Sequence, residues 1–253
     1  QITSIVSVES FDNDRYLLML TKAGFIKRTP LSAFSKIRSN GLIAINLEEG
    51  DALTWVRLST EGDSVLIGSS RGMTIHFRLD INELRPLGRT ARGVKSMNLK
   101  DGDKLVSMDV LTSDLVDQLA KIDNENEEDL ENNSSNGPWV LVASAFGLGK
   151  RVPVTQFRLQ KRAGMGLRAI KFRLKDDSLV GLKVLGEGEE LIFVTERGVI
   201  VRTNADKISQ QSRAATGVKL QRLDDGDHLS EVVLVPHEQI DDSDQLMSKE
   251  EEL

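Results

Sequence analysis

Short apolar runs, alternating with polar residues and separated by glycine-containing turns, follow one another along most of this chain. The first complete unit, residues 17–58, holds an apolar run (17–21), a turn at Gly24, a second run (25–29) and a polar loop (31–40). A third run (42–47) follows Gly41, and an acidic turn leads into a fourth run (52–58). Alternating runs joined by glycine turns predict β-strands and hairpins. We therefore expect four strands in this unit.

The same unit recurs three more times. Its first glycine returns at Gly72, Gly147 and Gly198. Its second glycine returns at Gly93, Gly166 and Gly217. Successive first glycines are 48, 75 and 51 residues apart, and an insert at 113–137 accounts for the longer interval. Four-stranded units with a period near 50 residues are typical of propeller blades. The expected fold is all-β, a β-propeller or β-pinwheel with four four-stranded blades in this chain, either as a closed ring or as an arc of a larger one.

Charge divides the chain into a basic body and two acidic appendages. The net charge is −6, but residues 113–137 carry −7 and residues 237–253 carry −6, which leaves +7 for the remainder. We expect blades one and two in 1–112, an acidic disordered insert at 113–137 that begins with a short helix, blades three and four in 138–236, and an acidic flexible tail at 237–253. A basic body attracts polyanions, and the appendages could compete for the same surface.

Basic residues recur at fixed distances from the glycines. Four residues after the first glycine stand Arg28, His76, Arg151 and Arg202. Two residues after the second glycine stand Ile43, Lys95, Arg168 and Lys219. Further candidates near these positions are Lys36, Arg38, Arg89, Arg92, Lys150, Lys161, Arg162 and Arg213.

Recurrence in register predicts a curved band of positive charge along the blade edges. Such a band suits a phosphate backbone, because arginine pairs with phosphate in a bidentate manner. Arg28 is preferred to its neighbour Lys27, because only the position of Arg28 is basic in every repeat. The alternative is that these side chains are ordinary solvated surface cations.

Other chemistry is poorly supported by the sequence. Aromatic residues make up 4% and lie inside strand patterns, which favours a core role over stacking on nucleic-acid bases. The recurring acidic turns are typical of hairpins rather than of a ring of catalytic carboxylates; they contain Asp51, Asp103, Asp177 and Asp227. The chain has no cysteine, no P-loop, no nucleophile elbow and no metal motif. We expect no active site, metal, cofactor or membrane span; a protein-interaction propeller and, more remotely, a propeller glycosidase are the rivals to a DNA-binding role.

Four segments, in this order, resemble the C-terminal domain of the A subunit of DNA gyrase: LTKAGFIKRTPLSAF, GLIAINLEEGDALTWV, ARGVKSMNLKDGDKLVS and AATGVKLQRLDDGDHLSEVVLV. The resemblance covers nearly all of residues 2–236, and the related topoisomerase IV subunit has a similar domain. It implies a six-bladed β-pinwheel with hairpins exchanged between blades, whose basic rim wraps double-stranded DNA and supports ATP-dependent negative supercoiling. It also implies a bacterial-type cytoplasmic enzyme, a heterotetramer of the A and B subunits of gyrase, in which other domains use ATP and Mg.

Two departures from the family pattern limit what the resemblance transfers. The chain resembles only the last four blades, and the family's glutamine–arginine–arginine–glycine–glycine–lysine–glycine box of the first blade is absent. Residues 160–166, QKRAGMG, are a degenerate echo of that box. The family's catalytic tyrosine lies in a part that this chain does not contain, so Tyr16 inherits no role and the chain by itself is expected to be non-catalytic.

Overall fold

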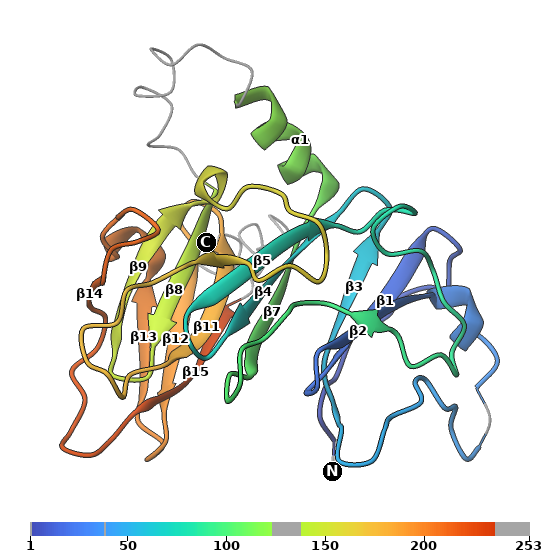
Figure 1. Ribbon diagram of the computed structural model, residues 1–253, viewed down its shortest axis with the longest axis horizontal. Helices are drawn as coiled ribbons and strands as arrows, with labels where there is room; N and C mark the ends of the chain where they lie inside the picture. The colour runs from blue at the N-terminus through green and yellow to red at the C-terminus, as the bar shows by residue number, and fades with distance from the viewer. Residues whose placement is uncertain (1, 38, 123–137, 236–253) are drawn as a thin grey trace, which may run out of the picture.

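In a computed structural model of the chain, the described residues are 2–37, 39–122 and 138–235. They form fifteen strands, three short 3-10 helices and one α-helix. Figure 1 shows the strands grouped into successive sheets, from the blue N-terminal sheet on the right to the orange C-terminal strands on the left. The prediction of an all-β protein built from repeated blades is confirmed.

Each of the four sheets corresponds to one blade. Blade one has the order β3-β1-β2-β6 and consists of β1 (Arg15–Thr21), β2 (Phe25–Pro30), β3 (Leu53–Thr60) and β6 (Val94–Lys95). Blade two has the order β10-β5-β4-β7 and consists of β4 (Ser64–Ser69), β5 (Met73–Arg78), β7 (Leu105–Leu111) and β10 (Leu167–Arg168). Blade three has the order β11-β8-β9-β14 and consists of β8 (Trp139–Ser144), β9 (Leu148–Pro153), β11 (Leu179–Leu185) and β14 (Val218–Lys219). Blade four has the order β13-β12-β15 and consists of β12 (Glu190–Thr195), β13 (Ile200–Asn204) and β15 (Leu229–Val235).

The outermost strand of each four-stranded blade comes from the following repeat. β6 pairs with β2, β10 pairs with β5, and β14 pairs with β9, all antiparallel. The four strands of repeats two, three and four are therefore each divided between two neighbouring sheets, in keeping with the exchange between blades that the family resemblance implied. Residues 42–47, the corresponding run of repeat one, form no strand, because none of the described blades lies ahead of blade one to receive it.

The second glycine of repeats two to four permits this exchange. Gly93 has a φ of 102°, and a Cβ atom there would lie 2.6 Å from the carbonyl oxygen of Ile26 on β2. Gly217 has a φ of 93°, and its Cβ would lie 2.6 Å from the carbonyl oxygen of Gly149 on β9. Any other residue would combine a disfavoured backbone conformation with a clash against the preceding blade.

The three larger hydrophobic cores lie between neighbouring blades, and a smaller one is formed within repeat one by Met19, Phe34 and Ile45. Leu18 and Leu20 of blade one are buried in one cluster with Val65, Ile67 and Phe77 of blade two. Two equivalent clusters join blade two to blade three and blade three to blade four. A blade alone would leave such a face exposed to water, so each blade depends on its neighbour for stability.

The helices lie between strands. The 3-10 helices η1 (Leu31–Phe34), η2 (Val154–Gln156) and η3 (Ala205–Lys207) each follow the second hairpin strand of their repeat. Helix α1 (Ser113–Ile122) follows β7 and packs Val116 and Leu115 against the core between blades two and three. The helix expected at the start of the insert is thus present, while 123–137 and the predicted acidic tail lie outside the described residues. In the described part of the chain, no helix is long and apolar enough to cross a bilayer.

Candidate nucleic-acid interface

Three basic side chains occupy equivalent places on the outer edges of blades one to three. Lys95, Arg168 and Lys219 are each the second residue of the two-residue outer strand, and each is exposed. Their partners in the ladder are Phe25, Met73 and Leu148, each the residue that directly follows the hairpin glycine. The regular glycine spacing of the sequence thus becomes a regular placement of positive charge, and we call these three residues the rim cations.

The hairpin turns add cations that the sequence reasoning missed. The residue after each rim cation donates its N–H to the carbonyl of the first glycine, as Ser96 does to Gly24 at 2.9 Å. The turn residues Lys22, Arg71 and Arg197 are exposed, and Lys22 and Arg71 belong to the blades that carry Lys95 and Arg168. Their position just before the first glycine was a signal in the repeat that could have identified them.

Arg28 is not a surface residue, and its prediction as a DNA contact is wrong. Its side chain is fully buried beneath the loop that crosses from repeat two. Its Nε donates to the carbonyl of Leu84, its Nη1 pairs with Glu61 at 2.6 Å, and its guanidinium lies 4.6 Å from the centroid of the Tyr16 ring. A group without exposed surface cannot reach a phosphate, so this arginine fastens the crossing loop to blade one.

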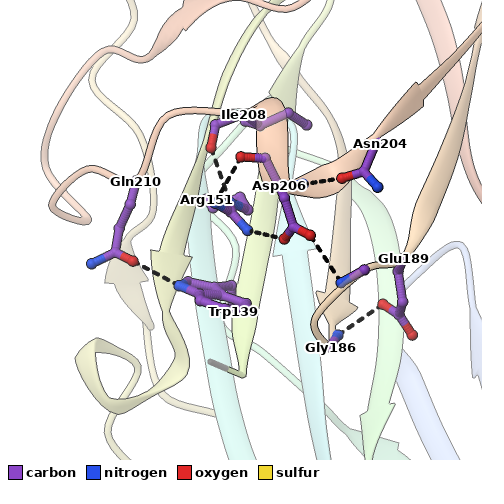
Figure 2. A network of polar contacts seen from close by, with 9 residues as sticks. Trp139, Arg151, Gly186, Glu189, Asn204, Asp206, Ile208 and Gln210 are labelled. Carbon is purple, nitrogen blue, oxygen red and sulfur yellow. Dashed lines mark hydrogen bonds and ion pairs between the residues drawn. The ribbon is translucent and has the colours of Figure 1, made fainter. Parts of the chain in front are cut away.

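The equivalent residues of blades two and three hold the crossing loop in the same way. His76 is buried and hydrogen-bonded to the Phe157 carbonyl at 2.6 Å, and burial lowers its pKa, which opposes the basic role expected from its position. Arg151 donates from Nε to the Ile208 carbonyl at 2.9 Å and pairs with Asp206 at 2.8 Å (Figure 2). Its side chain is only 11% exposed, so the predicted contact of Arg151 with DNA is also corrected to an internal anchor.

Asp206 and Trp139 complete the anchor around Arg151. Asp206 also accepts the backbone N–H of Gly188 at 3.0 Å. Trp139 lies under the guanidinium and donates its indole N–H to Gln210 at 2.8 Å (Figure 2). In blade four the equivalent Arg202 is exposed and pairs with Glu190 of its own hairpin. The recurrence at this position therefore reflects attachment of the next repeat in blades one to three.

Lys150 is likewise an internal residue. Its side chain is fully buried, and its ammonium donates to the carbonyls of Ser212, Arg213 and Ala215 at 2.6–2.7 Å. Burial, together with the nearby positive charge of Arg213, lowers the pKa of Lys150 to about 8. The predicted DNA contact at Lys150 is wrong, since its donors are turned inward to the loop of repeat four.

Lys27 does the same in blade one. It is fully buried and donates to the carbonyls of Gly88 and Arg89, and burial lowers its pKa to about 8. Lys27 and Arg28 are adjacent on β2, and both are covered because carbonyls of the crossing loop accept hydrogen bonds from both side chains. Neither residue of the pair is available to a ligand.

The remaining predicted cations lie at or near the surface. Lys36, Lys161 and Arg92 are exposed, and Arg92 stacks on Phe25 at 4.3 Å and pairs with Glu48. Arg89 is half-buried, and its guanidinium has no hydrogen bond or ion pair to another described residue. The prediction for Arg38 falls outside the described residues.

Arg162 and Arg213 are half-buried and bind the preceding repeat. Arg162 donates from Nε to the Glu83 carbonyl at 2.9 Å and from Nη1 to the Lys95 carbonyl at 2.7 Å. Arg213 donates from Nη1 to the Arg168 carbonyl. Each of these arginines therefore contacts the backbone of a rim cation.

The acidic turns are structural, as their sequence context indicated. Asp103 accepts hydrogen bonds from the hydroxyls of Ser69 and Ser70 and from the N–H of Arg71 at 2.7–3.0 Å. Asp177 accepts the Ser144 hydroxyl and a backbone N–H of the corresponding hairpin turn. These carboxylates stabilise the hairpin turns, and among the described residues no cluster of histidine and acidic side chains is suited to hold a metal ion.

Comparison with known proteins places these features in a family. The family described as "DNA gyrase C-terminal domain, beta-propeller" matches residues 15–60, 63–112, 138–185 and 189–236. The DNA gyrase A subunit of Synechocystis sp. is 55% identical over 246 residues, which cover 93% of this chain and 28% of that protein. The chloroplastic/mitochondrial DNA gyrase A subunit of Arabidopsis thaliana is 38% identical over 99% of this chain and 26% of that protein. The chain thus spans little more than a quarter of these relatives.

Two solved structures share the fold. A DNA gyrase A C-terminal domain superimposes with a TM-score of 0.70 at 28% identity, over 90% of this chain and 68% of that one. The C-terminal domain of a DNA topoisomerase IV superimposes with a TM-score of 0.75 at 24% identity, over 97% of this chain and 68% of that one.

Proposed function

The chain belongs to the DNA gyrase C-terminal domain family, and from that premise we propose that it is a non-catalytic, DNA-wrapping module of a type II topoisomerase. The observation that carries the proposal is the equivalent placement of Lys95, Arg168 and Lys219 on the outer strands of consecutive blades. Cations repeated along an outer edge follow a phosphate backbone and carry no base-specific pattern. We therefore propose binding of duplex DNA with little sequence preference.

A curved array of blades would bend the DNA that binds along its outer edges. Duplex DNA that follows cations on successive blades must bend around the outside of the domain, and the many phosphate contacts offset the cost of bending. In a whole gyrase, such wrapping would present a segment of the same DNA for strand passage in a fixed sense. We propose that the module supports ATP-dependent negative supercoiling in this way.

The remaining parts of the enzyme would lie elsewhere. The proposed partners are the catalytic part of the gyrase A subunit, which supplies the active tyrosine, and the gyrase B subunit, with ATP and Mg bound by domains other than this one. The place of action would be the cytoplasm, at the nucleoid. Assembly can be checked by measuring whether this chain, fused behind a catalytic part that lacks its own C-terminal domain, restores supercoiling with the B subunit.

DNA binding and wrapping are tested on the chain itself. Duplex binding is measured from low to moderate salt, and a nicked circle is religated with and without bound chain to detect a change in linking number. We expect affinity to fall steeply with salt, because each neutralised phosphate contributes a slope of roughly −0.9 in log–log form. Binding that is absent at low salt, or insensitive to salt, would refute the proposal and favour a protein-interaction propeller instead.

A further inference from the structure

Each rim cation of blades one and two has its backbone held by an arginine of the following repeat. Arg162 Nη1 donates to the carbonyl of Lys95 at 2.7 Å, and Arg213 Nη1 donates to the carbonyl of Arg168. Both arginines lie four residues before the second glycine of their repeat. The two contacts are therefore one feature that occurs twice, and we call these two residues the clasp arginines.

The clasp arginines and the rim cations alternate along the chain of contacts from blade to blade. Lys95 is bonded to Arg162, which lies in the crossing loop that leads into β10 and Arg168. Arg168 is in turn bonded to Arg213, which lies in the loop that leads into β14 and Lys219. Successive rim cations are thus connected through one side-chain hydrogen bond and one short loop, in addition to the packed cores between their blades.

The loops between clasp and rim cation are themselves fixed to the preceding repeat. In the loop of repeat three, Ala163 donates its N–H to the Ser96 carbonyl, and Gly164 accepts from the N–H of Asn98, both at 2.8 Å. In the loop of repeat four, the buried ammonium of Lys150 binds three carbonyls, among them that of Arg213. Little freedom is left for a rim cation to move relative to the next one.

We propose that Arg162 and Arg213 are positioning residues that set the spacing of the rim cations along the DNA track. The inference rests on the proposed DNA-wrapping function and adds to it a reason for the curvature of the wrapped DNA. Phosphates lie at fixed intervals along a duplex, so cations held at a matching interval bind them without a further loss of conformational entropy. Cations on loosely coupled blades would bind the same phosphates without imposing a bend.

The guanidinium group, rather than positive charge alone, is needed for this task. Arg162 binds carbonyls of two separate segments, Glu83 with Nε and Lys95 with Nη1. Lysine keeps the charge, but its single ammonium on a flexible stem does not reproduce this fixed fork. An arginine-to-lysine exchange therefore separates positioning from charge.

The chain contains a matched control for this exchange. Arg89 also lies four residues before a second glycine, Gly93, but its guanidinium has no hydrogen bond or ion pair to another described residue. Arg89 is not one of the rim cations, and Arg89→Lys keeps its positive charge, so the exchange alters the same register position without breaking a clasp. Any general effect of exchanging arginine for lysine at this position is common to the control and the test variants.

The experiment compares unmodified chain, Arg89→Lys and the double variant Arg162→Lys/Arg213→Lys for duplex affinity at low salt, linking-number change on religated nicked circles, and thermal unfolding. We expect the double variant to keep its affinity within about twofold, since no charge is lost, but to lose roughly half or more of the linking-number change. Arg89→Lys should match the unmodified chain in both. The single variants Arg162→Lys and Arg213→Lys should each lose part of the linking-number change. If the double variant does not fold, these single variants provide the test.

The two proposals fail in different ways. A double variant, or folded single variants, with the same linking-number change as the unmodified chain would overturn the positioning role while leaving DNA wrapping intact. An equal loss in Arg89→Lys would also overturn it, because that variant breaks no clasp. If the unmodified chain itself neither binds duplex DNA nor changes the linking number, the proposed function fails first.

Discussion

Replacement of Lys150 by methionine separates an internal anchor from a DNA contact. Methionine keeps most of the volume of the buried side chain but leaves the carbonyls of Ser212, Arg213 and Ala215 without their common donor. The matched control is Lys219→Met, because Lys219 is an exposed rim cation for which the described residues provide no hydrogen-bond partner.

The size of the effect follows from two opposing contributions. Hydrogen bonds from a charged donor contribute about 1.5–3 kcal/mol each, so loss of three costs roughly 4.5–9 kcal/mol. The fall of the Lys150 pKa from its usual 10.5 to about 8 corresponds to about 3 kcal/mol against the buried charge, which the substitution relieves. We expect a net destabilisation of roughly 1.5–6 kcal/mol, and a fall in Tm of about 3–24 °C for a chain of this size.

Thermal unfolding and duplex binding of both variants provide the assay. Lys150→Met should unfold at a lower temperature than the unmodified chain. Below that temperature it should bind DNA with nearly the affinity of the unmodified chain. Lys219→Met should unfold as the unmodified chain does, with a change within about 0.5 kcal/mol, and bind DNA more weakly. The reasoning would be refuted by a Lys150→Met protein that unfolds normally and loses as much DNA affinity as Lys219→Met.

Two further predictions concern the same architecture. The pKa of Lys150 is lower in the folded chain than in the unfolded one, so the folded state releases this proton first as the pH rises. The stability of the unmodified chain relative to Lys150→Met should therefore increase between about pH 8 and 10.5, by at most about 1.4 kcal/mol per pH unit. Denaturant unfolding at several pH values tests this, and a decrease over that range would contradict it. Gly93→Ala should destabilise the chain by more than about 2 kcal/mol, because its Cβ would strike the Ile26 carbonyl, whereas Gly41→Ala, at the same register position with a φ of 78° and open space around it, should cost only about 1 kcal/mol. Equal losses in the two alanine variants, measured by unfolding, would show that the close approach at Gly93 is unimportant.

The repeat, the hairpins and the role of the acidic turns could be predicted from the sequence because they depend on local patterns. Apolar alternation around Gly24 and Gly72 predicts paired strands whatever surrounds them. An aspartate beside a glycine between two strands is a turn residue, and Asp103 serves the adjacent hairpin as expected.

The exchange of outer strands could not be predicted from these patterns. Alternation indicates that a run such as 94–95 is extended, but it does not identify the strand with which the run pairs. Residues 42–47 have the same pattern and form no strand, because a run at this position pairs with the preceding blade and none of the described blades precedes blade one. Partner choice was available only from the family resemblance, which implied exchanged hairpins.

The sequence also could not show which of the basic residues are internal and which are exposed to a ligand. A position that is basic in several repeats can bind a repeated external ligand or a repeated internal partner, and the pattern is the same for both. Arg28 and Lys150 bind loop carbonyls of the next repeat, which are acceptors that no sequence pattern reveals. Their long aliphatic stems pack within the blades while the charged heads reach these acceptors, so burial did not require apolar residues.

The central claim, that the outer strands carry the DNA track, is tested most directly by the salt dependence of duplex binding in a triple variant, Lys95→Gln/Arg168→Gln/Lys219→Gln. Its control is Arg57→Gln/Lys183→Gln, which removes cations that line a pocket between β3, β7, β11 and β15; β3, β7 and β11 are the edge strands opposite those that carry the rim cations. The account predicts that the triple variant lowers the magnitude of the log–log slope by about 2–3, since up to three phosphate contacts are lost, and that the control leaves the slope unchanged. An unchanged slope in the triple variant, or an equal loss per charge in the control, would contradict it.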